Sequence, residues 1–414
     1  MDFDLIVLNS SSIATFDKSP VRGKESNTPL IIESGAIGIK KDKIVWWGKE
    51  ADLPSRKAKQ VIDANGGLVT PGLVDPHTHL VFAGNRVEEY QLKLRGVSWR
   101  EIVQRGGGIS KTVDETRRAS KQELLNHAQK YAREMLSYGT TTAEVKSGYG
   151  LTLEDEVKIL EVAKAIDIID IVPSFLGAHT VPQGLTRREY VAHLTDVMLP
   201  HIKGKKLAEF CDVFLDKGGF TLTEARKILE KAKDLGFKIK INCNQFTSTG
   251  GIQLAEQLQC HSVDYLTVME TEDFDTLSNT DMAAVLLPGS SFFLHYGYAP
   301  GRKLIDKGII VALGSDFNPG ICPTYSLQMI WALACRECGL LPEEAFAALT
   351  TNAAYAIGKK EVCGRIAKGM AADLVLWNAK TLAEIPYYFG LNLVNKVIKH
   401  GKIAYTKNIP DINN

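Results

Sequence analysis

An apolar, strand-like run that begins at Leu68 ends in Val74-Asp75-Pro76-His77-Thr78-His79-Leu80. Seven further strand-like runs follow along the chain: Thr141–Val145, Ile171–Leu176, Cys211–Leu215, Lys238–Ile241, Val263–Val268, Ala283–Leu287 and Ile309–Leu313. Amphipathic helical stretches separate most of them, including Glu123–Tyr138, Leu153–Ala165, Leu222–Leu235 and Ile252–Gln259. Alternating strands and helices are typical of an α/β protein with a parallel sheet. Eight such units over roughly 250 residues predict a (β/α)8 TIM barrel. An open doubly wound sheet is the alternative, but it needs a glycine fingerprint after its first strand, and this sequence lacks one.

The two ends of the chain have a different pattern from the middle. Residues 1–67 contain the short strand-like segments Phe3–Asn9, Ala36–Lys40, Lys43–Trp47 and Gln60–Asp63. Residues 363–414 contain three more, Ala372–Trp377, Val394–His400 and Lys402–Tyr405. Neither end is long enough to bury a sizeable core alone. We therefore predict one small β-sandwich domain built from both termini, 1–67 plus 363–414, around a barrel domain at 68–362.

The composition excludes several classes of function. The chain has 414 residues, of which 45% are hydrophobic and 23% charged, and its formal net charge is +1. Lysines and arginines are spread along the chain, which argues against a nucleic-acid partner or a polybasic membrane anchor. No run of about 18 apolar residues indicates a membrane span. The acidic start lacks the basic region of a signal peptide, and the seven dispersed cysteines are typical of a reducing compartment. We therefore expect a protein of a reducing compartment that binds neither nucleic acid nor a membrane.

The histidine pair is the strongest local signal of chemistry. Residues i and i+2 of a strand point to the same face, so His77 and His79 aim together at the C-terminal end of the first barrel strand. Barrel enzymes place their active sites at this end. Paired imidazoles suit zinc or iron. The alternative is two polar residues at a strand end with no metal.

Three further side chains follow other barrel strands. Asp316 comes directly after the eighth strand, beside strand one, where a carboxylate can complete a metal site and accept a proton from water. Without the histidines, an aspartate there is often only a turn or helix cap. His179 ends strand three, where a substrate role is favoured over a structural one. Lys146 ends strand two and is expected to be solvated or charge-paired rather than a carbamylated metal bridge.

At this point the sequence resembles a known family. The Val74–Leu80 motif, Asp316 and the split β-sandwich resemble the amidohydrolase superfamily. Longer motifs are similar to the imidazolonepropionase family, in order through nearly the whole chain: Phe82-Ala-Gly-Asn-Arg86, Arg105-Gly-Gly-Gly-Ile109, Glu144-Val-Lys-Ser-Gly-Tyr-Gly-Leu151, Phe175-Leu-Gly-Ala-His179, Val285-Leu-Leu-Pro-Gly289, Asp316-Phe-Asn-Pro-Gly320 and Ile385-Pro-Tyr-Tyr-Phe-Gly390.

The resemblance implies a hydrolase that converts 4-imidazolone-5-propanoate to N-formimidoyl-L-glutamate in histidine degradation. It implies one zinc or iron ion and a cytoplasmic homodimer. By motif match, the metal positions are His77, His79, Asn242 and Asp316. The matched substrate positions are Arg86, Tyr149, His179, Gln245, Asn318, Gly320 and Ile321. The catalytic positions are Asp316, Gln245 and Tyr265, and Gln245 matches a position that contacts the imidazolone ring.

Two of these positions depart from the family pattern. Asn242 stands where the family has its third metal-binding histidine, and Tyr265 stands where it has a histidine beside the attacking water. An amide oxygen is a poor ligand for zinc or iron beside imidazole. Tyrosine has an ordinary pKa of about 10, so Tyr265 is not a base at neutral pH, although its hydroxyl can donate to an oxyanion. A smaller departure is Ile321, where the family usually has a small hydroxyl residue.

Three hypotheses about function follow. The first is metal-dependent hydrolysis of imidazolonepropanoate, with turnover impaired by Asn242 and Tyr265. The second is a non-catalytic binding protein that keeps the pocket but lacks a working metal centre. The third is a hydrolase or deaminase of another cyclic amide, which would leave Arg86 without a carboxylate partner. Metal content separates the first two, and His261, Cys243 and His295 are the candidates for a substitute ligand.

Overall fold

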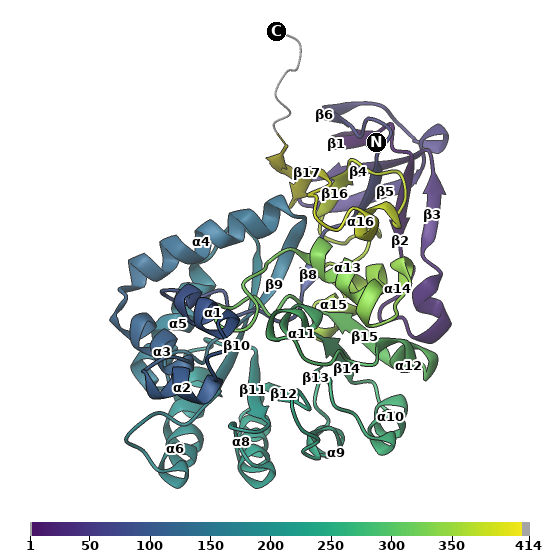
Figure 1. Cartoon of the computed structure of the whole chain (residues 1–414). Helices are drawn as coiled ribbons and strands as arrows, with labels where there is room; N and C mark the ends of the chain where they lie inside the picture. Colours follow the sequence, from purple (N-terminus) through teal and green to yellow (C-terminus); the bar gives the residue numbers. More distant parts are fainter. Residues whose placement is uncertain (1, 408–414) are drawn as a thin grey trace.

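The central part of the protein is a barrel of eight parallel strands surrounded by helices (Figure 1). The structure is a computed structural model that describes residues 2–407. The barrel strands, in their order around the sheet, are β8 (Leu73–Asp75), β9 (Thr140–Lys146), β10 (Asp170–Ala178), β11 (Phe210–Leu215), β12 (Lys238–Cys243), β13 (Ser262–Tyr265), β14 (Ala283–Leu286) and β15 (Ile310–Leu313). Each corresponds to one of the eight predicted runs, so the predicted TIM barrel is confirmed.

The barrel closes just beyond the ends of its first and last strands. Thr78 and Phe317 form an isolated parallel bridge. The backbone N–H of Asp316 donates to the His77 carbonyl at 2.9 Å, and that of His79 donates to the Phe317 carbonyl at 2.9 Å. The segment that carries the histidine pair is therefore held directly against the segment that carries Asp316.

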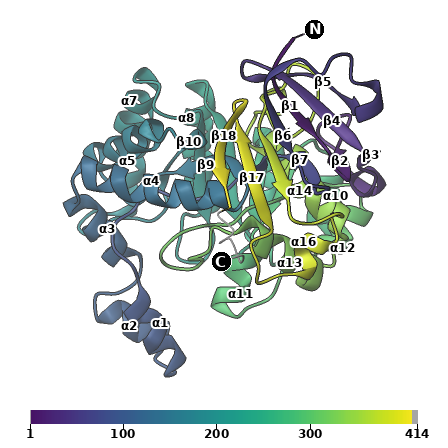
Figure 2. The same ribbon diagram turned by 90° about the horizontal axis from the view of Figure 1, so that it is seen from above.

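Helices cover the outside of the barrel and fill its connections. They are α1 (Val87–Leu94), α2 (Trp99–Gln104), α3 (Ile109–Arg118), α4 (Lys121–Ser137), α5 (Leu153–Ala165), α6 (Arg187–His193), α7 (Leu199–Gly204), α8 (Leu222–Asp234), α9 (Gly251–Leu258), α10 (Thr271–Ser278), α11 (Pro288–Leu294), α12 (Gly301–Asp306), α13 (Leu327–Glu337), α14 (Pro342–Leu349), α15 (Thr351–Ala356) and α16 (Glu384–Tyr387), with short helical turns at Gly23–Asn27, Glu50–Asp52 and Leu194–Met198. Ser120 and Thr221 begin α4 and α8 as capping boxes with a glutamate three residues later. Figure 2 shows α1 and α2 projecting from the edge of the barrel.

Both ends of the chain form the second part of the molecule, as predicted. One sheet has four strands in the order β5 (Lys43–Lys49), β4 (Gly35–Lys40), β1 (Phe3–Leu8) and β6 (Ala58–Asp63). The other has six, in the order β18 (Lys402–Thr406), β17 (Val394–Lys399), β16 (Leu374–Trp377), β7 (Leu68–Pro71), β2 (Ser12–Thr15) and β3 (Leu30–Glu33). Leu5, Val7 and Ile37 of the first sheet share a buried cluster with Val69 and Leu374 of the second. The sandwich core is therefore built from residues more than 300 positions apart.

The structure corrects one predicted strand. The run Leu68–Leu80 is two strands separated by Gly72: β7 pairs with β2 and β16, whereas only β8 pairs with the barrel strand β9. A side chain at Gly72 would collide with Thr141 of β9, 2.1 Å away, so glycine permits this close passage between the two parts. Strands β2 and β3 were not predicted. The division at 1–67 plus 363–414 and 68–362 stays a prediction, and the pairing of β7 favours a boundary a few residues later.

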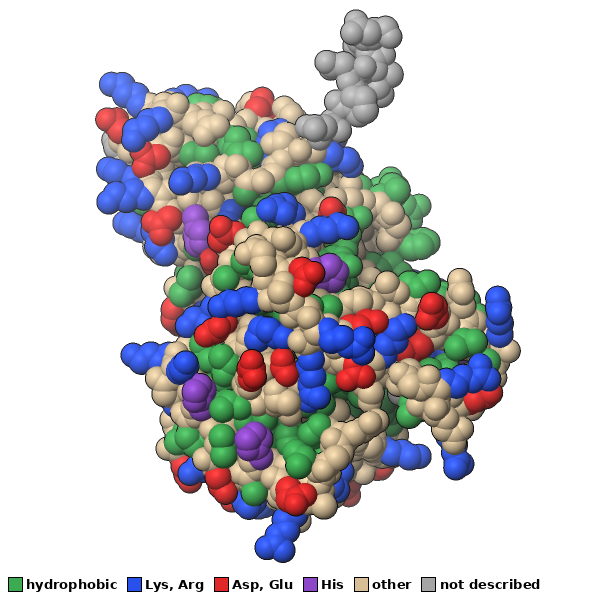
Figure 3. Space-filling model, turned by 90° about the vertical axis from the view of Figure 1, so that its left-hand side faces the viewer, with side chains coloured by type: hydrophobic (Ala, Val, Ile, Leu, Met, Phe, Trp, Pro, Cys, Tyr) green, Lys and Arg blue, Asp and Glu red, His purple; other side chains and the backbone are tan. Residues whose placement is uncertain are grey.

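The surface agrees with the composition. Lys, Arg, Asp and Glu side chains are interspersed on the face in Figure 3. Within residues 2–407, the structure contains no helix with the length and apolar character needed to cross a membrane.

Candidate active site

The three strongest sequence candidates meet at the C-terminal end of the barrel. His77, His79 and Asp316 are buried, and their ligand atoms all lie within 4.8 Å of one another. Asp316 Oδ1 is 3.6 Å from His77 Nε2 and 3.9 Å from His79 Nε2. These distances place the two imidazole nitrogens and one carboxylate oxygen around a common point.

The hydrogen bonding of His77 tests whether a cation fits there. His77 Nδ1 is 2.7 Å from Asp264 Oδ2, and an ionised carboxylate only accepts, so Nδ1 carries the proton. His77 Nε2 is then an acceptor, and it is buried without a hydrogen-bond partner. In this neutral tautomer it faces a second acceptor, Asp316 Oδ1, 3.6 Å away, and no hydrogen bond joins the two atoms. Two buried acceptors arranged in this way fit a metal cation, and this residue set is suited to a divalent ion.

Asn242 lies beside this set. It follows Lys240 by two residues on β12, and it is the register partner of Asp264 on β13, so its side chain points into the barrel as theirs do. Its Oδ1 atom is buried without a hydrogen-bond partner in the described chain. An unsatisfied buried acceptor costs about 1–3 kcal/mol, which a cation in contact with it would offset.

The second oxygen of Asp316 is held by hydroxyl groups. Ser290 Oγ donates to Asp316 Oδ2 at 2.5 Å, and the Tyr265 hydroxyl donates to the same atom at 3.1 Å. Asp316 and Tyr265 both have positive φ, 53° and 82°, in the left-handed region that side chains other than glycine rarely adopt. Burial raises the pKa of Asp316 and raises that of Tyr265 well above its usual value. Tyr265 therefore remains a protonated donor at neutral pH.

Aromatic rings line the wall next to His79. The His179 ring stacks on His79 with centroids 5.3 Å apart, and the Tyr149 ring lies 5.5 Å from His79. His179 Nδ1 is 3.1 Å from the Gly148 carbonyl, which orients the ring. Burial lowers the pKa of His179 to about 4 and lowers that of His79 well below its ordinary value. Both imidazoles are therefore neutral near pH 7, and His179 is brought to the site as predicted.

Arg86 is a buried cation at the start of α1. It precedes α1 and is 9% exposed, and its Nε donates to Thr112 Oγ1 of α3 at 2.9 Å. Among the described residues no carboxylate forms an ion pair with it. Gly320 lies against the guanidinium, since a Cβ at that position would be 2.3 Å from Nη1. The end of Arg86 is thus free for an anionic ligand.

Three further predicted substrate positions have different surroundings: Gln245, Asn318 and Ile321. Gln245 is buried at the end of β12, and its Nε2 donates to the Tyr296 hydroxyl at 3.1 Å. Asn318 Nδ2 donates to Asp316 Oδ1 at 2.9 Å, and its Oδ1 accepts from the backbone N–H groups of Gly320 and Ile321. Asn318 therefore braces the loop after β15. Ile321 is partly buried against the cluster that contains Tyr265.

Four residues at the site were not assigned a role from the sequence: Asp264, Ser290, Thr112 and Tyr296. An aspartate within the apolar strand Ser262–Tyr265 was a usable signal, because a charge in a buried strand requires a partner. Ser290 directly follows the recognised Val285–Gly289 motif. Nothing local marked Thr112 or Tyr296, since their contacts are with distant segments.

The substitute metal ligands considered from the sequence do not join the cluster. His261 Nε2 is bound to the Tyr355 carbonyl at 2.8 Å, just before the start of β13, at the other end of the barrel. Cys243 faces α9, where a Cβ at Gly251 would lie 2.7 Å from its own. His295 is absent from the metal-capable groups found among the described residues. Lys146 is charge-paired, as predicted, with Asp212 at 2.6 Å and Glu144 at 3.0 Å, but it is fully buried rather than solvated.

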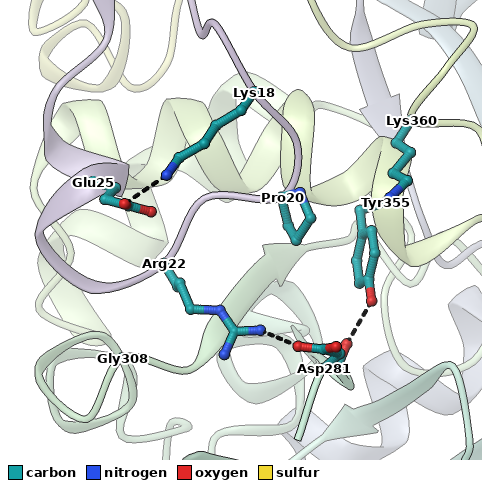
Figure 4. A pocket seen from close by; sticks show the side chains of 8 residues that line it. All are labelled: Lys18, Pro20, Arg22, Glu25, Asp281, Gly308, Tyr355 and Lys360. Carbon is teal, nitrogen blue, oxygen red and sulfur yellow. Dashed lines mark hydrogen bonds and ion pairs between the residues drawn. The ribbon is translucent and has the colours of Figure 1, made fainter.

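Two other polar clusters lie away from the site. A cavity of about 710 Å³ near the start of β14 and β15 is lined by Lys18, Pro20, Arg22, Glu25, Asp281, Gly308, Tyr355 and Lys360 (Figure 4). Four of its charges are paired within it, Lys18 with Glu25 and Arg22 with Asp281, and Lys360 Nζ lies over the Tyr355 ring. The other cluster joins Asp170, Asp373 and His400, where Lys399 already lies 2.7 and 2.6 Å from the two carboxylates.

The sequence matches a known family and full-length members of it. Residues 68–404 match the sequence profile of the amidohydrolase family. The imidazolonepropionase of Bacillus thuringiensis (strain Al Hakam) is 44% identical over 412 residues, which cover 98% of this chain and 97% of that protein. The imidazolonepropionase of Bacillus mycoides (strain KBAB4) is 43% identical over the same coverage.

Solved structures share the fold at low sequence identity. They include an E. coli guanine deaminase, with TM-score 0.71, 17% identity and coverage of 97% of this chain and 99% of that one. An A. niger ochratoxinase has TM-score 0.71 and 18% identity over 98% and 96% of the two chains. An adenosine deaminase from Xanthomonas campestris, described with bound zinc, has TM-score 0.69 and 17% identity over 97% and 93%. Taken with the full-length relatives, these findings show that the chain belongs to the amidohydrolase family and, within it, to the imidazolonepropionases.

Proposed function

We propose that the barrel mouth hydrolyses 4-imidazolone-5-propanoate to N-formimidoyl-L-glutamate in histidine degradation, with one metal ion held by His77, His79 and Asp316. The observation that carries the site is the pair of buried acceptors, His77 Nε2 and Asp316 Oδ1, 3.6 Å apart. The full-length match to imidazolonepropionases supports the reaction. Such a hydrolase acts on a C–N bond of a cyclic amide.

The residues fit one zinc or iron ion, our proposed cofactor. When bound, such an ion supplies Lewis acidity, which lowers the pKa of a coordinated water from about 15.7 to about 7. Asn242 contributes its unpaired amide oxygen beside the three ligands. Because a neutral amide oxygen is a weaker donor than imidazole, we expect weaker metal binding than three histidines would give.

Proton movements are assigned to Asp316. Its Oδ2 atom, set in place by Ser290 and Tyr265, accepts a proton from the attacking water. Water adds to the ring carbonyl carbon, the ring C–N bond breaks, and the proton passes to the departing nitrogen. The raised pKa of Asp316 suits this transfer, because a stronger base accepts the proton more readily. Tyr265 acts as a hydrogen-bond donor and not as a base.

Substrate is held at both of its ends. Arg86 pairs with the propionate carboxylate, since its guanidinium lies against Gly320 and has no carboxylate partner within residues 2–407. Gln245, positioned by Tyr296, contacts the imidazolone ring. Neutral His179 and Tyr149 line the wall beside His79, and Asn318 and Ile321 shape the loop next to it. Holding the ring in line with the attacking water supplies much of the catalytic benefit of such a pocket.

The assay is loss of imidazolonepropanoate, followed by its ultraviolet absorbance with zinc or iron supplied. This chain is compared with the double variant Asn242→His, Tyr265→His. We expect turnover by this chain and faster turnover by the double variant. If neither protein turns over, the substrate assignment is wrong. If only the double variant does, the non-catalytic interpretation of this chain is correct.

We also propose that the protein acts in the cytoplasm as a homodimer, as the family resemblance implies. Light scattering of the purified protein tests the oligomeric state. A mass of one chain at micromolar concentration would contradict it.

A further inference from the structure

Beneath His77 the barrel interior contains a closed network of charged side chains. Glu144, Lys146, Asp212, Lys240 and Asp264 are all 0% exposed. Lys146 Nζ lies 2.6 Å from Asp212, 3.0 Å from Glu144 and 3.5 Å from Asp264. Lys240 Nζ lies 2.8 Å from Glu144. Burying five charges is costly, and strand packing alone would be served as well by apolar residues, so a specific use of the network is expected.

Asp264 is the member of this network that contacts a proposed metal ligand. Its Oδ2 atom lies 2.7 Å from His77 Nδ1. Its Oδ1 atom accepts from Ser262 Oγ at 2.8 Å. With Lys146 on a third side, the carboxylate is held in one orientation. Any displacement of Asp264 would therefore be passed directly to the His77 ring.

The buried charged network carries an excess of negative charge. The network holds three carboxylates and two ammonium groups, which leaves one excess negative charge, and Asp316 adds a second. The neighbouring Asp75 accepts hydrogen bonds from the backbone N–H groups of Ser315 and His77, which stabilise its carboxylate. A cation at His77 and Asp316 would offset negative charge at the end of the network next to it.

We propose that Asp264, anchored by Lys146 and Ser262, is a positioning residue for the metal. It keeps the proton of His77 on Nδ1 and thereby presents the Nε2 lone pair to the ion. This inference rests on the proposed metal site and extends it to residues that do not touch the ion. A carboxylate behind a ligating histidine typically changes metal affinity by about 10–100-fold.

The test measures zinc binding by metal-stripped protein, with a chelating dye as competitor, for the wild type and Asp264→Asn. Asparagine has the same shape but can donate, and it no longer requires the proton on His77 Nδ1. We expect a rise of about 10–100-fold in the zinc dissociation constant. In the metal-free protein, ¹⁵N spectra of labelled histidine should show His77 protonated on Nδ1 in the wild type and not in the variant.

Asp212→Asn is the matched control. Asp212 contacts the same lysine, at 2.6 Å, and is equally buried, but it does not touch His77. We expect its zinc affinity to stay within about threefold of the wild type, because Lys146 remains paired with Asp264. Equal losses in the two variants would mean that the network is only structural, and would overturn the inference.

Ser262→Ala tests the same idea without changing any charge, should Asp264→Asn fail to fold. It releases Asp264 Oδ1, so we expect a smaller loss of zinc affinity in the same direction; no loss would overturn the inference. His77→Ala distinguishes a wrong metal site from a wrong role for Asp264. If His77→Ala binds zinc as well as the wild type, the metal site itself is wrong. If it loses zinc while Asp264→Asn and Ser262→Ala do not, only the role of Asp264 is wrong.

Discussion

The backbone N–H of Asp316 donates to the carbonyl of His77 at 2.9 Å, and this hydrogen bond joins the segment after the last barrel strand to the segment after the first. The two residues it connects are also two of the proposed metal ligands, and their side chains face the same point. Barrel closure and metal-site assembly are therefore one structural event. The site should form only when the segments that follow β8 and β15 are paired.

Removing the metal is expected to abolish hydrolysis. The drop in water pKa from about 15.7 to about 7 corresponds to about 12 kcal/mol at about 1.4 kcal/mol per unit. No other effect at the site is as large. Dialysis against a chelator, followed by assay with and without added zinc or iron, checks this. Full activity in protein shown to be free of metal would contradict the proposal.

Two replacements of Asn242 should change metal affinity in opposite directions. Asn242→His supplies an imidazole in place of the unpaired amide oxygen, so we expect at least about tenfold tighter zinc binding. Asn242→Leu removes the oxygen and should weaken it. Competition with a chelating dye measures both. Identical affinities in all three proteins would show that this side chain does not reach the ion.

Truncating Arg86 should affect substrate binding more than turnover. A hydrogen bond to a charged group contributes about 1.5–3 kcal/mol, so Arg86→Met should raise KM about 10–100-fold with a smaller change in kcat. Arg86→Lys, which keeps the charge but loses two-point contact, should fall between. An analogue with an uncharged amide in place of the carboxylate serves as the control. Equal losses on both substrates would contradict pairing with the carboxylate.

Tyr265→Phe should slow the reaction modestly. The variant loses one hydrogen bond to Asp316 Oδ2, about 0.5–1.5 kcal/mol, which predicts a kcat about 2–10-fold lower. Because the pKa of Tyr265 is raised well above its usual value, the variant should not change the shape of the pH–rate profile near neutrality. Tyr265→His should add a new titration there. A lost titration step near pH 7 in Tyr265→Phe would mean that Tyr265 acts as a base.

Acid should destabilise the fold through His179. Its pKa is lowered from 6.5 to about 4 by burial, so the unfolded chain binds the proton more readily than the folded one. The associated stability is present above pH 6.5 and is lost as the pH falls toward about 4. The full shift corresponds to about 3 kcal/mol at about 1.4 kcal/mol per unit. Denaturant unfolding of the wild type and His179→Gln at several pH values measures this. The free energy of unfolding of the wild type should fall relative to that of the variant as the pH is lowered across this range.

Much of the fold follows from local patterns. Eight apolar runs separated by amphipathic helices predicted the barrel strands, because a buried parallel strand and a helix with one apolar face have distinct periods. The first run was misjudged at one point. Leu68–Pro71 and Leu73–Asp75 look alike as sequence, and only their partners, β16 and β9, separate them. Strands β2 and β3 were not predicted because each is only four residues long and because β2 also depends on β7, which lies more than 50 positions along the chain.

For the site, local sequence patterns were enough to identify the side chains at the barrel mouth, since His77, His79, His179 and Asp316 follow strand ends and parallel strands end at one edge. Which residues hydrogen-bond these side chains and hold them in place became clear only from the tertiary structure. Asp264 contacts His77 across 187 positions, and Ser290 contacts Asp316 from α11, the helix that follows β14. Such contacts depend on strand order and register, which arise from packing of the whole chain and leave no local pattern in the sequence.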